Sequence, residues 1–156
     1  ESMFGGDFGA FRTQNKSFFN REHPVYKEIK KLAELRNEYI HLRLGRQYLR
    51  EISDLKSNNF HLPKKKKKRC REIIAWSRIF SQNEFLLAVN CELERTQKAE
   101  VIIDSEIHLP GEKFICVYSS DENKIGEERE IKEAEPGKSY LELEIPAKGR
   151  AIYKSV

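Results

Sequence analysis

The sequence predicts a mainly β protein, an antiparallel, Greek-key-like β-sandwich preceded by one amphipathic α-helix. Two observations support this fold class. Beyond Gly45, short segments with hydrophobic residues at every second position follow one another at the spacing of sandwich strands. Turn-forming pairs separate several of them, at residues 110–111, 136–137 and 148–149. Before Gly45, hydrophobic residues recur every three or four positions, which is the period of a helix.

Residues 1–20 show neither period, and we expect them to form a loop. Three glycines and five phenylalanines lie in this segment. Glycine allows sharp turns, whereas so many aromatic side chains are poorly suited to water. We therefore expect the segment to pack against another part of a protein.

The helix is expected over residues 24–40. Asn20 or the pair His23-Pro24 can begin it, because proline suits the first helical position. Gly45 is expected to end the helical region. Its hydrophobic positions form one stripe and are Val25, Ile29, Leu32, Ala33, Leu35 and Tyr39.

The expected strands follow in order. They lie near residues 48–52, 73–80, 85–91, 99–104, 114–119, 139–146 and 150–154, with a weak strand near Glu130. The second and third flank the turn-like residues 81–84 and predict a hairpin. Residues 140–145 alternate hydrophobic and polar side chains, as a strand with one face in water does. Trp76 is expected in the core, with stacking on a sugar as the less favoured alternative.

Basic charge is concentrated in one run of the chain. The net charge is +4, and residues 64–69 alone carry six positive charges. A local run does not produce the broad basic surface of a nucleic-acid-binding protein, so no nucleic acid partner is expected. We favour a solvated loop between two strands, because no aromatic residue interrupts the run. A nuclear localisation patch and a polyanion-binding arm are the alternatives.

The three cysteines, Cys70, Cys91 and Cys116, follow neither a disulfide framework nor a metal-ligand spacing. Cys91 and Cys116 fall in apolar runs and are expected as buried free thiols. An odd number of thiols favours a cytoplasmic over a secreted location, although one pair plus one free thiol stays open. The histidines are scattered, so no metal and no cofactor are expected. No apolar run approaches the ~20 residues that a membrane-spanning helix needs.

Several motifs point to one family. Residues 3–12, Met-Phe-Gly-Gly-Asp-Phe-Gly-Ala-Phe-Arg, contain an aromatic-Gly-x-acid-x-Gly pattern. His23-Pro24-x-Tyr26, a helix with Leu35-Arg36, Leu42-Arg43-x-Gly45 and Ile-Ala-Trp-Ser-Arg at 74–78 follow. This succession resembles the end of the catalytic barrel and its junction with the C-terminal sandwich in α-amylase-family glycoside hydrolases.

The resemblance implies two domains and a function. Residues 1–44 would be the loop and last helix of a (β/α)8 barrel, and residues 45–156 the C-terminal β-sandwich domain. The chain would be a non-catalytic fragment of an enzyme that acts on α-glucans, stabilising the barrel and assisting polysaccharide binding. The expected partners are the parent's catalytic barrel and α-glucan polysaccharide. Self-association through the exposed helix is also expected, because the barrel is missing.

No catalytic residue is expected in this chain. The family's nucleophile is an Asp two residues after an Arg, and another essential Asp follows a His, but neither pattern occurs here. We therefore expect the chain alone to be inactive. Substrate-binding candidates at the barrel rim of the intact parent are Asp7, Arg12, Phe18 and Phe19. The alternative function is a stand-alone carbohydrate- or polyanion-binding β-sandwich module.

Overall fold

The computed structural model describes residues 20–66 and 69–156, apart from the side chains at positions 65, 66 and 69. The chain forms two units, which meet between Tyr39 and Ile40. The described part of the first unit is dominated by helix α1, and the second unit is a β-sandwich. The domain boundary expected between residues 44 and 45 stays a prediction.

Helix α1 spans Pro24–Glu38. His23 caps its N-terminus, because its Nδ1 atom accepts a hydrogen bond from the Val25 amide at 3.2 Å, and Pro24 is the first helical residue as expected. The prediction of one continuous helix over residues 24–40 is wrong at its C-terminal end. Tyr39 is extended, and a separate short helix, α2 (Ile40–Leu44), follows it. Hydrophobic periodicity locates a helix but does not define its final residues.

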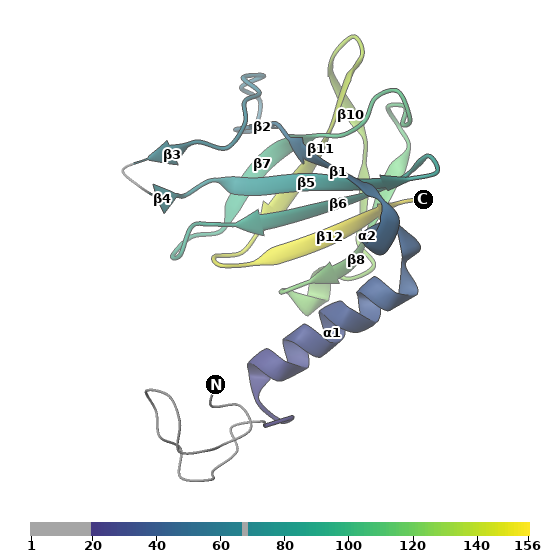
Figure 1. Ribbon diagram of the computed structural model, residues 1–156. Helices are drawn as coiled ribbons and strands as arrows, with labels where there is room; N and C mark the ends of the chain where they lie inside the picture. Colours follow the sequence, from purple (N-terminus) through teal and green to yellow (C-terminus); the bar gives the residue numbers. More distant parts are fainter. Residues whose placement is uncertain (1–19, 67–68) are drawn as a thin grey trace. The chain divides into compact units, whose positions relative to one another are not determined.

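The sandwich consists of two antiparallel sheets (Figure 1). The larger sheet contains, in spatial order, β1 (Arg46–Arg50), β5 (Ile73–Phe80), β6 (Asn83–Asn90), β12 (Arg150–Ser155), β8 (Lys113–Ser119) and β9 (Glu128–Glu130). The smaller sheet contains β10 (Lys132–Glu135), β11 (Lys138–Ile145), β7 (Gln97–Ile102) and β2 (Ile52–Ser53). The chain crosses repeatedly between the sheets, and β12 inserts between β6 and β8. The predicted antiparallel, Greek-key-like sandwich is confirmed.

The core lies between the two sheets. Alternate residues of each strand point inward, so β11 alternates buried and half-buried positions along its whole length. The buried hydrophobic cluster contains Ile52, Ile73, Ala75, Leu86, Ala88, Ala99, Val101, Ile103, Phe114, Cys116, Ile131, Leu141, Leu143, Ile145, Ala151 and Tyr153. Its aliphatic residues come from both sheets, which therefore share one core.

The β5–β6 hairpin is confirmed with a shorter turn than expected. Phe80 pairs with Asn83, so the turn consists of Ser81 and Gln82 alone. Both have positive φ, at 51° and 65°. Two positive φ values define a type I′ turn, whose twist matches that of the paired strands.

Trp76 is not part of the core, and the prediction for it is wrong. Ile73 and Ala75 of β5 are buried, and Trp76 lies half-buried on the opposite face of the same strand. The sequence could not decide between the two faces, because residues 73–76 are apolar on both.

Residues 64–71 contain more structure than the solvated loop expected there. Strands β3 (Lys65–Lys66) and β4 (Arg69–Cys70) pair as a small antiparallel hairpin. This hairpin is separate from both large sheets. A 3₁₀ helix, η1 (Glu122–Lys124), lies in the connection between β8 and β9.

Candidate functional site

The four predicted rim residues, Asp7, Arg12, Phe18 and Phe19, lie outside the described residues, and their assignment stays a prediction. Two surface features stand out in the sandwich unit. One is an apolar face on the larger sheet, and the other is a polar cleft at one end of the sandwich.

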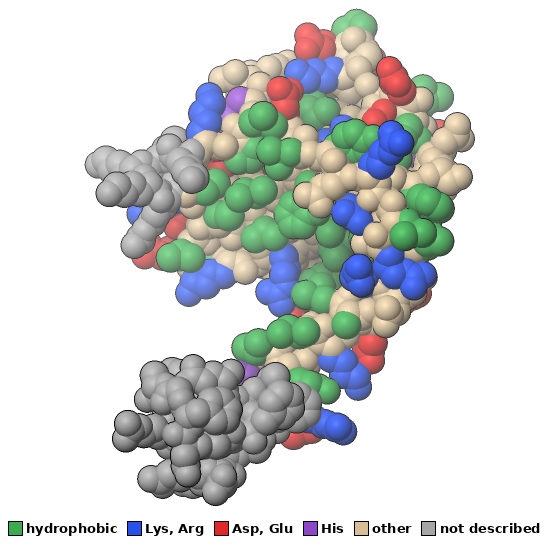
Figure 2. All heavy atoms as spheres, in the orientation of Figure 1, with side chains coloured by type: hydrophobic (Ala, Val, Ile, Leu, Met, Phe, Trp, Pro, Cys, Tyr) green, Lys and Arg blue, Asp and Glu red, His purple; other side chains and the backbone are tan. Residues whose placement is uncertain are grey.

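The apolar face is built by side chains at one register across five strands. We call this set the outer row, and its members are Leu49 of β1, Trp76 of β5, Leu87 of β6, Ile152 of β12 and Tyr118 of β8. Each member is directly opposite the next, so all five lie on the face of the sheet that points away from the core. Figure 2 shows hydrophobic side chains gathered over β5, β6 and β12.

Ile74 of β5 and Val89 of β6 are directly opposite each other, two residues along from Trp76 and Leu87. They extend the same apolar face. The exposed fraction varies along the face: Leu49 is 54% exposed, whereas Ile152 is only 6% exposed. The exposed end of the row therefore lies on the edge strand β1, and its covered part lies toward the middle of the sheet.

Helix α2 covers one end of this face. The His41 ring stacks on Phe85 with centroids 5.0 Å apart and meets Phe80 edge-on at 6.0 Å. Arg78 holds the end of the helix, since its Nη2 atom donates to the carbonyls of Leu42 and Arg43 at 3.3 and 3.2 Å.

The environment of His41 favours its neutral form. Burial lowers the pKa of His41, and the nearby Lys154 ammonium lowers it further. Gly45 then leads the chain into β1, and a Cβ at this position would collide with the His41 carbonyl oxygen.

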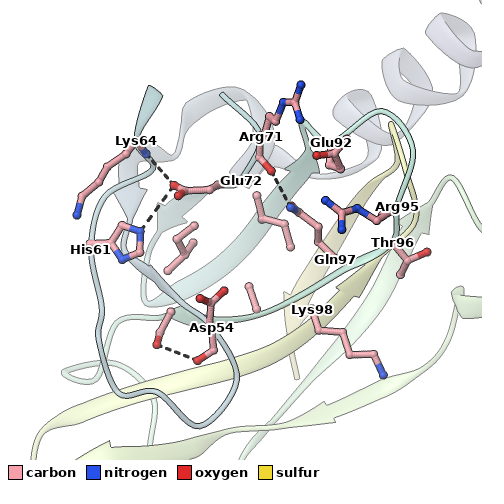
Figure 3. Close-up of a pocket in the computed structure, with 14 residues that line it drawn as sticks. Asp54, His61, Lys64, Arg71, Glu72, Glu92, Arg95, Thr96, Gln97 and Lys98 are labelled. Carbon is pink, nitrogen blue, oxygen red and sulfur yellow. Dashed lines mark hydrogen bonds and ion pairs between the residues drawn. The ribbon is translucent and has the colours of Figure 1, made fainter. Parts of the chain in front are cut away.

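The cleft has a volume of about 640 Å³ and opens between β2, β5 and β7 (Figure 3). Glu72 lies on one side, where it accepts a hydrogen bond from the Lys64 amide at 2.8 Å and lies 3.6 Å from His61 Nε2. Gln97 ties the floor to this segment by donating to the Arg71 carbonyl at 2.6 Å. These contacts attach the segment that leads into and out of the β3–β4 hairpin.

The chemistry of the cleft is polar and mixed. The described residues that line it include both acidic and basic side chains, and none of them is Phe, Tyr or Trp. Sugar sites commonly use an aromatic ring as a stacking platform, so the cleft lacks that feature. The buried Glu92 is already engaged, because it accepts a hydrogen bond from the Leu93 amide at 2.9 Å. Glu72 and Glu92 are thus both held by backbone amides.

A buried polar cluster brings a serine, a histidine and a carboxylate together without catalytic geometry. Ser77 donates its hydroxyl hydrogen bond to Glu84, and His108 Nε2 lies 3.4 Å from the same carboxylate. An activated serine needs the base beside its own hydroxyl. Here the Ser77 hydroxyl donates its hydrogen bond to the Glu84 carboxylate and not to His108, so the cluster has a structural role.

Among residues 20–66 and 69–156, no three or more His, Cys, Asp or Glu side chains are grouped as a metal site would need. Within the same residues, no helix has the length and apolar character needed to cross a bilayer.

Comparison of the sequence with protein-family models and with curated proteins gives no match. The fold, however, is similar to part of several solved structures. The native debranching enzyme from Nostoc punctiforme matches 94% of this chain with a TM-score of 0.58 and 17% identity. An isomaltulose synthase variant from Erwinia rhapontici, solved with D-glucose, matches 95% of it with a TM-score of 0.50 and 16% identity.

These neighbours are α-amylase-family glycoside hydrolases, and the chain corresponds to a small part of each. It spans 24% of the debranching enzyme and 21% of the isomaltulose synthase. At this identity the similarity establishes a shared fold. The described fold is therefore one that occurs as a portion of larger carbohydrate-active enzymes.

Proposed function

We propose that this chain is the non-catalytic C-terminal part of an α-amylase-family glycoside hydrolase acting on α-glucans, and that its sandwich stabilises the catalytic barrel. Residues 1–44 would supply the last loop and helix of that barrel. Three facts support the proposal: the motifs from residue 3 to 78, the fold shared with parts of such enzymes, and the missing Arg-x-Asp and His-Asp patterns.

The outer row is the observation that carries the proposal. A sandwich sheet normally presents polar side chains to water on its outer face. The smaller sheet does so: Lys132 pairs with Glu142 at 2.8 Å, and Lys98 pairs with Glu144 at 3.6 Å. The larger sheet presents the outer row instead. This asymmetry is expected if the larger sheet is covered by another domain.

The point at which the chain enters the sandwich unit also favours the outer face of the larger sheet as the covered face. Helix α2 lies on the outer face of the larger sheet, where His41 contacts Phe80 and Phe85. The residues before Ile40 therefore join the sandwich unit at this face. A barrel that precedes the sandwich in the chain would be connected to it there, next to the outer row.

The test uses the coding region upstream of Glu1 and the longer protein that it encodes. We expect that region to encode a barrel with Arg-x-Asp and His-Asp. In the longer protein, the double substitution Leu49→Ser and Trp76→Ser should lower both the thermal midpoint and starch hydrolysis. The same substitutions should affect the isolated chain less, because there the row has no partner to lose.

A matched control substitutes the outer face of the smaller sheet. Tyr140→Ser should change the longer protein and the isolated chain equally. The proposal fails if the outer-row variant also affects both forms equally. It also fails if the purified chain alone releases reducing sugar from starch and a point substitution within the chain abolishes that activity.

A further inference from the structure

Cys70 and Cys91 lie beside one another at the base of the β3–β4 hairpin. The Cys91 amide donates a hydrogen bond to the Glu72 carbonyl oxygen at 3.3 Å. The Cys70 thiol donates to the same oxygen, with its Sγ atom 3.9 Å away. The two cysteines therefore converge on one backbone atom. Burial raises the pKa of the Cys91 thiol, and the neighbouring Cys70 thiol raises it further.

The sheet register explains why they meet. The pairing of β5 with β6 ends at Ile73 and Asn90. Continuing the ladder by one residue places Glu72 opposite Cys91, which is the contact observed, and Cys70 is the last residue of β4, two residues before Glu72. The expected burial of Cys91 is therefore not found, because it lies just beyond β6 and is half-buried, as is Cys70.

The third cysteine is excluded from any such pair. Cys116 lies on β8 in the core, is 1% exposed and donates its thiol to the Tyr118 carbonyl at 3.4 Å. Burial raises the pKa of the Cys116 thiol to about 11, which suppresses the reactive thiolate. The structure thus distinguishes two accessible, adjacent cysteines from one inert thiol. The sequence alone did not show which cysteines could pair.

We propose that Cys70 and Cys91 are a modification site at which an intramolecular disulfide bond forms on exposure to an oxidising disulfide. The bond would fasten the hairpin to the junction of β5 and β6. Residues 64–69 contribute six positive charges, and Lys64, Arg71 and Glu72 border the cleft. Oxidation would therefore add a covalent link to the contacts of Glu72 and Gln97 that already hold the base of the hairpin beside the cleft.

The chemistry is thiol–disulfide exchange with glutathione disulfide as the oxidant. One cysteine thiolate attacks a glutathione sulfur, forming a mixed disulfide and expelling one glutathione thiolate. The second cysteine thiolate then attacks the protein sulfur and expels the other glutathione. Two protein thiols are oxidised, one glutathione disulfide is reduced, and the two protein thiol protons end on the two glutathione thiols.

The test treats the whole chain with glutathione disulfide, blocks free thiols with iodoacetamide and digests it with trypsin without reduction. Cleavage after Arg69, Arg71, Arg78 and Arg95 isolates Cys70 in residues 70–71 and Cys91 in residues 79–95. We expect these two peptides joined by a disulfide. In an oxidised sample that has not been alkylated, we expect Cys116 alone to react with Ellman's reagent once the protein is denatured. The link should disappear on adding dithiothreitol.

Two variants control the assignment. Cys116→Ser should still give the linked peptide, whereas Cys70→Ser should leave Cys91 free or as a glutathione adduct. In the oxidised native chain, the first tryptic cleavage within residues 64–69 should slow severalfold relative to the reduced chain. The proposal is overturned if all three thiols survive oxidation, if only glutathione adducts or disulfide-linked dimers form, or if the tryptic rate is unchanged.

Discussion

Arg50 of β1 and Glu84 of β6 form a buried ion pair across the intervening strand β5, with Nη2 2.9 Å from Oε1. Ser77 of β5 lies between them and bonds to both side chains, since Arg50 Nε donates to its Oγ atom at 2.6 Å. The second carboxylate oxygen of Glu84 accepts the Asp104 amide at 3.1 Å. This network joins the edge strand β1 to the interior of the larger sheet.

Breaking the Arg50–Glu84 pair should be strongly destabilising. Arg50→Met leaves the fully buried Glu84 carboxylate without its cation, and a loss of about 3–5 kcal/mol in the free energy of unfolding is expected. Urea denaturation of the whole chain measures it. Lys98→Met, which removes an exposed pair with Glu144, is the matched control and should have a far smaller effect. Equal losses in both variants would contradict the assignment.

Substitution of Asn90 should lower the stability of the fold strongly, because its side chain makes several buried hydrogen bonds. Its buried Nδ2 group donates to the carbonyls of Arg95, Ile145 and Pro146 at 3.0, 3.0 and 2.9 Å. Asn90→Asp replaces this donor with a carboxylate facing three carbonyl oxygens, so a loss of about 3 kcal/mol or more is expected. Thermal unfolding of Asn90→Asp and Asn90→Ala at pH 7 checks this. An aspartate variant more stable than the alanine variant would show that the donor role is unimportant.

The fold class was predictable because each strand carries its period within a few residues. Residues 140–145 and the 73–80 and 85–91 pair became β11, β5 and β6 with little change. The placement of Trp76 was not predictable, since both faces of β5 are apolar and the covering of the outer face is a tertiary property. The predicted hairpin signal located the turn, but not that Ser81 and Gln82 alone would form it.

The candidate site was predictable only in part. The rim residues depend on the resemblance to a family, and the structure does not describe them. The outer row joins residues as distant in sequence as Leu49 and Ile152, so only the strand order reveals it. The pairing of Cys70 with Cys91 depends likewise on the end of the β5–β6 register, which spacing alone does not give.

Alkaline pH should weaken the fold through Tyr153. Burial raises the pKa of Tyr153 to about 12, above the ordinary value of 10 for an unfolded tyrosine. Between these values the unfolded chain loses its phenol proton first, so it binds fewer protons and stability falls as pH rises from about 10 to 12. The loss should reach about 2–3 kcal/mol by the upper limit. Urea titrations at pH 9, 10 and 11 should show a shallower decline for Tyr153→Phe than for the unchanged chain; parallel declines would contradict the prediction.

The basic run should contribute little to stability. Changing residues 64–68 from lysine to serine should alter the free energy of unfolding by under ~0.5 kcal/mol, because exposed charges away from special contacts have small effects. Thermal melts of both proteins test this. A fall of several degrees would show that the run is paired structurally. Loss of a salt-sensitive affinity for heparin would instead favour the polyanion-binding alternative.

The isolated chain should self-associate through its exposed apolar surface. Val25 and Ile29 of α1 are 57% and 60% exposed, and Leu49 of the outer row is 54% exposed. Light scattering should therefore report a mass above that of the monomer. A version beginning near Gly45 should associate less. A monomeric whole chain whose residues 20–40 exchange amide protons slowly would show that this surface is covered within one molecule.

The position of β12 also constrains how the protein is made. This last strand lies between β6 and β8, so the larger sheet remains divided into two halves until residues 150–155 have emerged from the ribosome. During that interval β6 and β8 each present an unpaired edge, which favours association with other nascent chains. Folding of the sandwich consequently requires β12 to have been synthesised. A premature stop even a few codons before Arg150 should yield a product bound by chaperones and degraded, instead of a slightly shortened domain.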